Sequence, residues 1–263
     1  MPRRIRHLYR FVGVSLVVVV QFSCQLDYAG PGTTDGNRCQ VTATPYILGD
    51  NTAGALTTSD CRLADGSYID YYGTTLPAGG YVFNQSSTEF DTYLFLLTAD
   101  RLLIGLDDND PQGSTNSAIK ALLPAGDFIL GANAYPGSTG AYNLSSTAST
   151  TDATSCEDVY VVKGTSTTQN LQTSDCSASM SYADHYIIAV RAGQSITITM
   201  SSAAFDSFVE LYDSSGRVAF NDKISTTSRY AQLTYNAPLS DFYFISAQSA
   251  GGIATGAYTL SVQ

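Results

Sequence analysis

The sequence repeats itself, and this limits the folds open to it more than any other feature. Two stretches carry the same short sequence motifs, or landmarks, in the same order, with spacings that agree to within one or two residues over about 110 positions. The landmarks lie at 39, 58–61, 67–70, 90–92, 107–108 and 140–145 in the first stretch, and at 156, 173–176, 181–184, 205–207, 221–222 and 256–261 in the second. We therefore expect two copies of one domain, at 39–147 and 156–263, joined by a Ser/Thr-rich linker at 148–155.

Short runs of alternating apolar and polar residues predict β-strands within each copy. Turn signals such as Pro-Ala-Gly at 124–126 and Ser-Ser-Gly at 214–216 separate these runs. Seven or eight strands in about 110 residues, with no amphipathic helical stretch, predict an all-β fold of two tandem, jelly-roll-like antiparallel β-sandwich domains. The clearest runs are 81–83, 93–97, 127–130, 195–200, 208–212 and 241–245.

The N-terminus is typical of an export signal. Residues 1–10 are basic, and residues 11–22 form an apolar run that is too short to span a bilayer as a helix. We expect 1–23 to be a signal peptide and 24–38, which is polar and rich in Gly and Asp, to be a flexible tether.

The Ser23-Cys24 pair that follows resembles the lipobox of bacterial lipoproteins, in which the Cys receives a lipid. Gln21 and Phe22 depart from that pattern, and ordinary secretory cleavage is the alternative. We expect Cys24 to be lipidated and the protein to lie at the cell envelope or surface, or otherwise to be secreted.

The other four cysteines fit an exported protein, in which disulfides are stable. Sequence alone permits three connectivities, and the repeat favours Cys39–Cys61 and Cys156–Cys176. Each bridge would close a loop of roughly twenty residues and contribute about 3 kcal/mol. The alternative, four reduced buried cysteines, conflicts with the leader. The predicted pairing leaves Cys24 for lipidation.

Charge and histidine content exclude several functions. The formal net charge is −10, which repels phosphate backbones, so we expect no nucleic-acid partner. The chain has two histidines, of which His7 lies in the leader, so the mature chain cannot build a multi-His metal centre.

Each copy resembles the bacterial pre-peptidase C-terminal domain, a jelly-roll-like sandwich found in secreted proteases and other exported proteins. The second copy departs from the family pattern at 238–240, where a Pro-Ala-Gly turn is degraded, and at Lys223, which replaces an Asp. The resemblance implies the fold and, because one fold hosts many functions, implies function only weakly. The matching residues in the first copy are Leu56, Asp60, Tyr68, Asp70, Tyr72, 78–79, 90–92, Leu94, Leu96, 107–108, 124–126, Phe128, Gly140, Tyr142 and Leu144. In the second they are Leu171, Asp175, Tyr182, Asp184, Tyr186, 192–193, 205–207, Val209, Leu211, 221–222, Gly256, Tyr258 and Leu260.

Catalysis lacks a convincing set of residues. Asp184 and His185 could suggest a dyad, but neighbouring residues of a strand point to opposite faces, so this Asp cannot orient this His. No Gly-x-Ser-x-Gly elbow is present either. We expect no catalytic residues and no enzymatic activity.

Acidic residues at strand ends form the one constellation that could bind a ligand. Calcium takes six to eight oxygen ligands, which loop Asp and Asn residues supply. The alternative is that these residues form turns by accepting main-chain N–H bonds. Lys223 weakens the second cluster by adding a positive charge. Calcium is the only cofactor we consider, at Asp91, Asp107, Asp108 and Asp110 in the first copy and at Asp206, Asn221 and Asp222 in the second.

These observations predict a non-enzymatic exported protein that binds an extracellular polymer or an envelope protein and contacts the membrane only through its lipid anchor. The alternative is a structural spacer or stabilising subunit without a tight ligand, and a hydrolase would need a cleft that converges on His185. An exposed aromatic patch on a sheet face would favour binding, and uniformly polar faces would favour the spacer.

Overall fold

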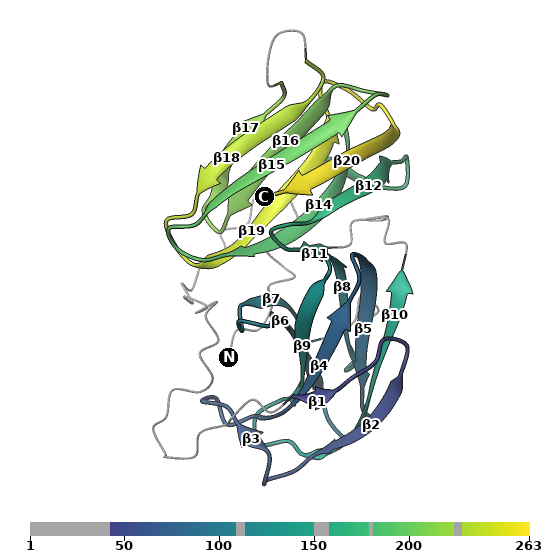
Figure 1. Ribbon diagram of the computed structural model, residues 1–263, viewed down its shortest axis with the longest axis vertical. Coiled ribbons are helices and arrows are strands. Elements are labelled where there is room, and N and C mark those ends of the chain that lie inside the picture. The colour runs from purple at the N-terminus through teal and green to yellow at the C-terminus, as the bar shows by residue number, and fades with distance from the viewer. Residues whose placement is uncertain (1–42, 109–113, 150–157, 179–180, 224–227) are drawn as a thin grey trace.

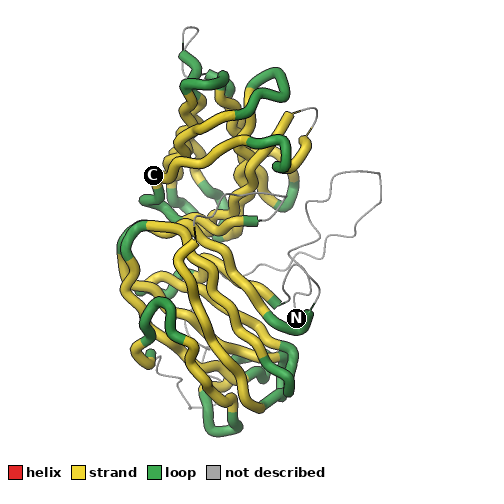
Figure 2. The backbone as a smooth tube through the Cα atoms, turned by 90° about the vertical axis from the view of Figure 1, so that its right-hand side faces the viewer, coloured by secondary structure: helices red, strands yellow, loops and turns green. Residues whose placement is uncertain are grey.

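The computed structural model describes residues 43–108, 114–149, 158–178, 181–223 and 228–263. These residues form twenty β-strands and no helix, which confirms the all-β fold class (Figures 1 and 2). In these ranges, no helix is long and apolar enough to cross a membrane.

The strands fall into two series of ten. The first series is β1 (Thr44–Pro45), β2 (Asn51–Leu56), β3 (Cys61–Arg62), β4 (Tyr68–Leu76), β5 (Gly79–Ser86), β6 (Thr92–Thr98), β7 (Leu103–Asp107), β8 (Ser117–Leu123), β9 (Gly126–Ala134) and β10 (Gly140–Ser149). The second series is β11 (Val159–Val161), β12 (Ser166–Leu171), β13 (Cys176–Ala178), β14 (Ser181–Val190), β15 (Ser195–Ser202), β16 (Ser207–Asp213), β17 (Gly216–Asn221), β18 (Ala231–Asn236), β19 (Asp241–Ser249) and β20 (Gly256–Val262).

The strand order of the first series recurs in the second, where each equivalent strand has a number that is higher by ten. One sheet of the first half runs β1-β4-β9-β6-β7 with β3 beside β4, and its facing strands run β8-β5-β10-β2. The second half has β11-β14-β19-β16-β17 with β13 beside β14, and its facing sheet runs β18-β15-β20-β12. Each half is a sandwich of two layers (Figure 1).

The pairing departs from the expected antiparallel pattern in three places. β1 runs parallel to β4, and β11 runs parallel to both β14 and β8. β1 and β4, like β11 and β14, can run in the same direction because the chain crosses to the facing sheet between them, through β2 or β12. Short strands of two or three residues at these edges also raise the count above the predicted seven or eight per copy.

The two halves share one sheet. β11 pairs with β14 on one side and with β8 of the first half on the other, in a register that places Tyr160 opposite Ala121 and Val161 opposite Leu122. The result is a ten-stranded sheet whose main path is β17-β16-β19-β14-β11-β8-β5-β10-β2.

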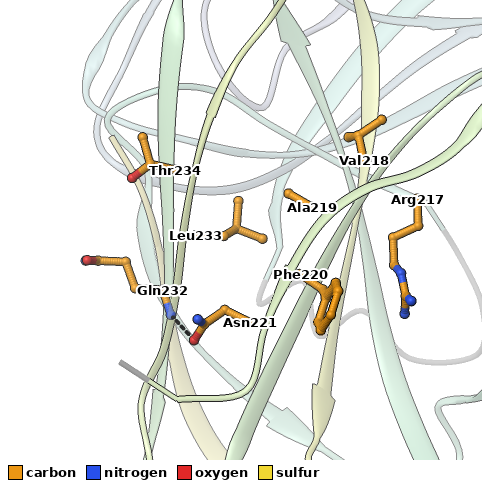
Figure 3. A pocket seen from close by; sticks show the side chains of 8 residues that line it. All are labelled: Arg217, Val218, Ala219, Phe220, Asn221, Gln232, Leu233 and Thr234. Carbon is orange, nitrogen blue, oxygen red and sulfur yellow. Dashed lines mark hydrogen bonds between the residues drawn. The ribbon is translucent and has the colours of Figure 1, made fainter. Parts of the chain in front are cut away.

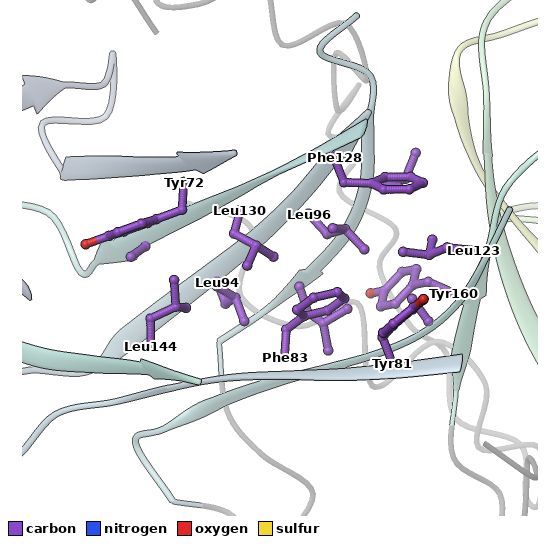
Figure 4. Close-up of a cluster of buried hydrophobic side chains, with 14 of the residues drawn as sticks. Tyr72, Tyr81, Phe83, Leu94, Leu96, Leu123, Phe128, Leu130, Leu144 and Tyr160 are labelled. Atoms are coloured by element: carbon purple, nitrogen blue, oxygen red, sulfur yellow. The ribbon is translucent and has the colours of Figure 1, made fainter. Parts of the chain in front are cut away.

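β11 also contributes to the hydrophobic cores of both halves, because its side chains alternate across the sheet. Val159 and Val161 belong to the core of the second half, whereas Tyr160 and Val162 pack into the core of the first. Figure 4 shows Tyr160 among the aromatic and aliphatic side chains of that first core.

Hydrogen bonds reinforce this junction. The Tyr160 hydroxyl donates to the Leu106 carbonyl oxygen at 2.8 Å, and Thr165 Oγ1 donates to the Leu122 carbonyl oxygen at 3.2 Å. Both acceptors belong to the first half, so the two sandwiches meet through a packed and hydrogen-bonded contact.

Candidate functional site

A trio of one partly buried aspartate and two buried tyrosines links the two sheets of the first half. The Tyr142 hydroxyl on β10 donates to Asp70 Oδ2 on β4 at 2.6 Å, and the hydroxyls of Tyr142 and Tyr72 lie 2.7 Å apart. Burial raises the pKa of the Asp70 carboxyl, although the hydrogen bond from Tyr142 acts in the opposite direction. Burial and the bond to Asp70 raise the pKa of Tyr142 well above its usual range, so this hydroxyl stays protonated.

The second half contains the same trio. The Tyr258 hydroxyl on β20 donates to Asp184 Oδ2 on β14, and it lies 2.5 Å from the Tyr186 hydroxyl. Burial is the main reason that the pKa of Tyr258 is raised. The sequence did not predict the trio, since the tyrosine of the last strand lies about 70 residues along the chain from the other two members, in a topology that short motifs do not specify.

Asp184 and His185 do not form a dyad. Asp184 is fully buried between the sheets with Tyr258, whereas the His185 ring packs edge-on against Phe244, 4.6 Å between centroids, on the other face of the sheet. This arrangement agrees with the strand geometry that argued against catalysis. Burial lowers the pKa of His185 to about 4, so the imidazole is neutral at pH 7.

Two of the residues predicted to bind calcium accept main-chain hydrogen bonds from the eighth strand of their half. Asp107 is buried at the end of β7, and its Oδ2 accepts the main-chain N–H of Ala118 at 2.7 Å. Asn221 occupies the equivalent place at the end of β17, and its Oδ1 accepts the N–H of Gln232 at 3.3 Å. These bonds correspond to the turn-forming alternative.

The other predicted ligands that the structure describes do not form a group that could hold a metal. Asp206 lies 3.4 Å from Arg229, and the carbonyl oxygens of Asp91 and Asp206 each accept an N–H from the chain that follows the ninth strand of their half. Asp108 and Asp222 follow the seventh strand of each half, and Asp222 is exposed. Asp110 lies outside the described residues. Within the described ranges, no three His, Cys, Asp or Glu residues are grouped so that they could hold a metal. Calcium binding stays a prediction.

The cysteines are described in part. Cys61 begins β3 and Cys176 begins β13, so the two occupy equivalent positions. Cys24, Cys39 and Cys156 lie outside the described residues, and the predicted pairings and lipidation therefore stay predictions.

A buried carboxylate that the sequence did not single out lies on the outer face of the second half, away from its facing sheet. Glu210 on β16 is paired with Arg217 of β17 at 2.5 Å, and it accepts hydrogen bonds from the Tyr212 hydroxyl and from Gln248 Nε2, both at 2.9 Å. Burial, followed by the bond to Glu210, raises the pKa of Tyr212 to about 12. Phe95 occupies the equivalent position in the first half, as the strand registers show.

An open groove lies beside this carboxylate, where the edges of the two sheets of the second half meet (Figure 3). We call it the β17–β18 groove, after the strands that line it. Phe220, at its rim, is 58% exposed, and the guanidinium carbon of Arg217 lies 4.5 Å from its ring centroid. Ala219 and Leu233 lie farther inside, so the groove joins an apolar interior to an aromatic and cationic rim.

Comparisons with known proteins identify no family for this chain. No family model matches it, and no curated protein does. Among solved structures, the pre-peptidase C-terminal domain of a collagenase from Bacillus anthracis is similar at 17% identity over 39% of this chain and 90% of that one, with a TM-score of 0.31. The CUB1-EGF-CUB2 segment of human MASP-1/3 (7% identity, 81% of this chain, 99% of that one, TM-score 0.25) and that of rat MASP-1 (10%, 83%, 100%, 0.23) also match. Such scores support no functional argument.

Proposed function

We propose that this protein acts by binding rather than by catalysis. In this proposal it is exported, anchored through Cys24, and presents two pre-peptidase C-terminal-like sandwiches, residues 39–147 and 156–263, that bind an extracellular polymer or an envelope protein. The recurrence of the strand order and of the Asp-Tyr-Tyr trio supports the assignment of two copies of one domain.

The observation that carries the proposal is the exposed Phe220 ring with Arg217 stacked on it at the open end of the second sandwich. Exposed aromatic and arginine side chains are enriched where proteins bind partners. Phe220 also lies 6.2 Å from the ring of Phe208, centroid to centroid, so two aromatic rings lie together on the sheet face. An aromatic patch of this kind is what distinguishes a binding surface from a uniformly polar spacer.

The residues that suggested a hydrolase support the same proposal. His185 is turned toward Phe244, and Asp184 is held inside the sandwich by Tyr258, so neither is arranged to activate a nucleophile.

A rigid spacer is the second candidate, and the shared ten-stranded sheet favours it. A spacer needs a fixed junction, which β11 supplies, but it does not need an exposed aromatic ring. The two candidates therefore differ in what they predict for a change at Phe220.

Affinity capture from the native cell envelope tests the proposal. The full-length protein and Phe220→Ser should be compared, with Ile253→Ser as the matched control because Ile253 is a similarly exposed apolar residue, at 67%. We expect a defined partner or polymer that the wild type and Ile253→Ser retain and that Phe220→Ser retains at least about fivefold less, a difference of about 1 kcal/mol. Equal recovery with all three proteins, or no specific recovery, would favour the spacer.

Membrane fractionation tests the anchor. Cys24→Ser should move the protein from the membrane fraction to the soluble fraction, because the lipid would be its only attachment. Unchanged membrane retention would contradict lipidation at Cys24.

A further inference from the structure

The chain itself shows a strand docked in the groove between the seventh and eighth strands of a sandwich. In the first half, β11 lies along the edge of β8, and its Tyr160 side chain enters the space between β7 and β8. A Cβ placed on Gly105 would lie 3.2 Å from the Tyr160 ring and 3.3 Å from Ile119, so the ring lies directly against Gly105. The Tyr160 hydroxyl bonds to the carbonyl of Leu106, the next residue of β7.

The β17–β18 groove is the equivalent place in the second half. The strand registers align Ala219 with Gly105, Phe220 with Leu106, and Leu233 with Ile119. All three line the open groove in Figure 3. In the described part of the chain, β18 pairs with β15 alone, whereas β8 pairs with β5 and β11.

We propose that the β17–β18 groove and the free edge of β18 receive an extended strand of another polypeptide, parallel to β18, as β11 lies on β8. This inference deepens the proposed binding function and rests on it, because it names a binding site and the chemistry of its ligand. Main-chain hydrogen bonds to a sheet edge would supply affinity, and the groove would select one side chain.

The groove selects against a large ring. Ala219 carries the Cβ that Gly105 lacks, and at Gly105 such an atom would crowd the Tyr160 ring. A strand seated on β18 would therefore place a smaller side chain there, so we assign the occupant a Val, Ile or Leu at the position of Tyr160.

A second molecule of this chain is a poor occupant. In a second copy, the strand most similar to β11 would be β1. The pairings of β1 with β4 and of β11 with β14 align Pro45 with Tyr160. Proline has no N–H to donate to a neighbouring strand, and edge strands use it to prevent pairing. The surface beside it is also polar, since Thr75 Oγ1 donates to Asp127 Oδ1 at 2.5 Å across β4 and β9. Because these features disfavour β1 of a second copy, we assign the groove to a strand of a different protein.

Peptide titration of the full-length, isotope-labelled protein by NMR tests the inference. The probes are three blocked peptides of residues 158–164: the native sequence, one carrying Tyr160→Val, and one carrying Tyr160→Pro. We expect the valine peptide to shift amide signals of β17 and β18 with a Kd of about 0.1–1 mM. The tyrosine peptide should bind at least about fivefold more weakly, and the proline peptide should not bind. Ala219→Gly should restore binding of the tyrosine peptide, because it recreates Gly105.

The other possible outcomes of this titration would overturn the inference or change the occupant. Absence of valine-peptide binding below about 10 mM, shifts outside β17 and β18, or equal binding of the proline peptide would overturn the inference. A concentration-dependent dimer that shifts the same signals without peptide would show that a second copy is the occupant. If no peptide binds but the envelope capture depends on Phe220, the strand-docking inference fails while the proposed binding function stands.

Discussion

The hydroxyl of Tyr160 lies 2.8 Å from the carbonyl oxygen of Leu106, and this contact joins a residue that begins the second sandwich to a strand of the first. Tyr160 is 8% exposed and packs in the core of the first half, although it lies 37 positions after Leu123, the last residue of β8. A side chain that lies in the core of the neighbouring sandwich couples the folding of the two.

The first prediction concerns this coupling. Tyr160→Ala should lower the free energy of unfolding by about 3 kcal/mol, because it removes a buried ring from a close-packed core, and Tyr160→Phe should cost only about 1 kcal/mol for the lost hydrogen bond. Chemical denaturation followed by fluorescence and circular dichroism measures both. We expect one transition in the wild type and two in Tyr160→Ala; a wild-type protein that unfolds in two steps would contradict the coupling.

Asp70 gives a prediction about pH. Burial raises the pKa of this carboxyl above its ordinary value of 3.8, so the native protein binds more protons than the unfolded chain in the window above that value. The stability that this group contributes is therefore lost as pH rises through the folded pKa. Asp70→Asn keeps an oxygen for Tyr142 but cannot ionise, so it should be more stable than the wild type at about pH 7, and the difference should shrink toward about pH 3. Urea titrations at both pH values decide this, and stability curves that run parallel would argue against a partly buried Asp70 with a raised pKa.

His185 gives the opposite pH dependence. Burial lowers its pKa from 6.5 to about 4, so the unfolded chain binds the proton more tightly and stability is lost as pH falls from about 6.5 to about 4. The loss should be on the order of 2 kcal/mol, allowing for partial solvent screening. His185→Tyr, which installs the residue found at the equivalent Tyr71, should remove that part of the pH dependence. The same slope in wild type and variant would mean that other groups cause it.

Replacing a buried serine by alanine should have different effects in the two halves, because a pair of bonded hydroxyls in the first half is incomplete in the second. Ser117 Oγ donates to the Thr92 carbonyl and lies 2.8 Å from Thr92 Oγ1, whereas the equivalent of Ser117 in the second half is Ala231. The buried Ser207 hydroxyl, which corresponds to that of Thr92, accordingly has no hydrogen-bond partner within the described residues.

Ser117→Ala should destabilise the protein by about 1–2 kcal/mol, and Ser207→Ala should be neutral or stabilising by up to about 1 kcal/mol. Thermal and urea unfolding of the two variants measure the difference. A clear loss of stability in Ser207→Ala would show that its hydroxyl has a partner.

The sequence predicted the regular part of the structure because that part depends on local patterns. The alternating runs at 93–97 and 208–212 lie in β6 and β16, and the turn at 214–216 separates β16 from β17 as expected. The short strands β1, β3, β11 and β13 were not predicted, because two or three residues are too few to show an alternation.

The junction between the two halves and the buried carboxylate on the outer face of the second half also could not be predicted from the sequence. Val159, Tyr160 and Val161 are apolar at every position, which is typical of a strand buried on both faces, but nothing local indicates that β8 of the other half is a neighbour. Glu210 was missed because its burial depends on Tyr212 of its own strand and on Arg217 and Gln248, which lie on the two neighbouring strands. The expected calcium ligands show a related limit, since Asp or Asn at a strand end gives the same sequence pattern whether it binds a cation or, like Asp107 and Asn221, accepts a main-chain N–H.

Residual dipolar couplings, measured on the full-length protein in a weakly aligning medium, test most directly the claim that β11 fuses the two sandwiches into one body. Amides of β4, β5, β9 and β10 report on the first half, and those of β14, β15, β19 and β20 on the second. The shared sheet predicts that a single alignment tensor fits both sets in the orientation shown in Figure 1. Two tensors of clearly different magnitude would mean that the halves move independently and would contradict the account.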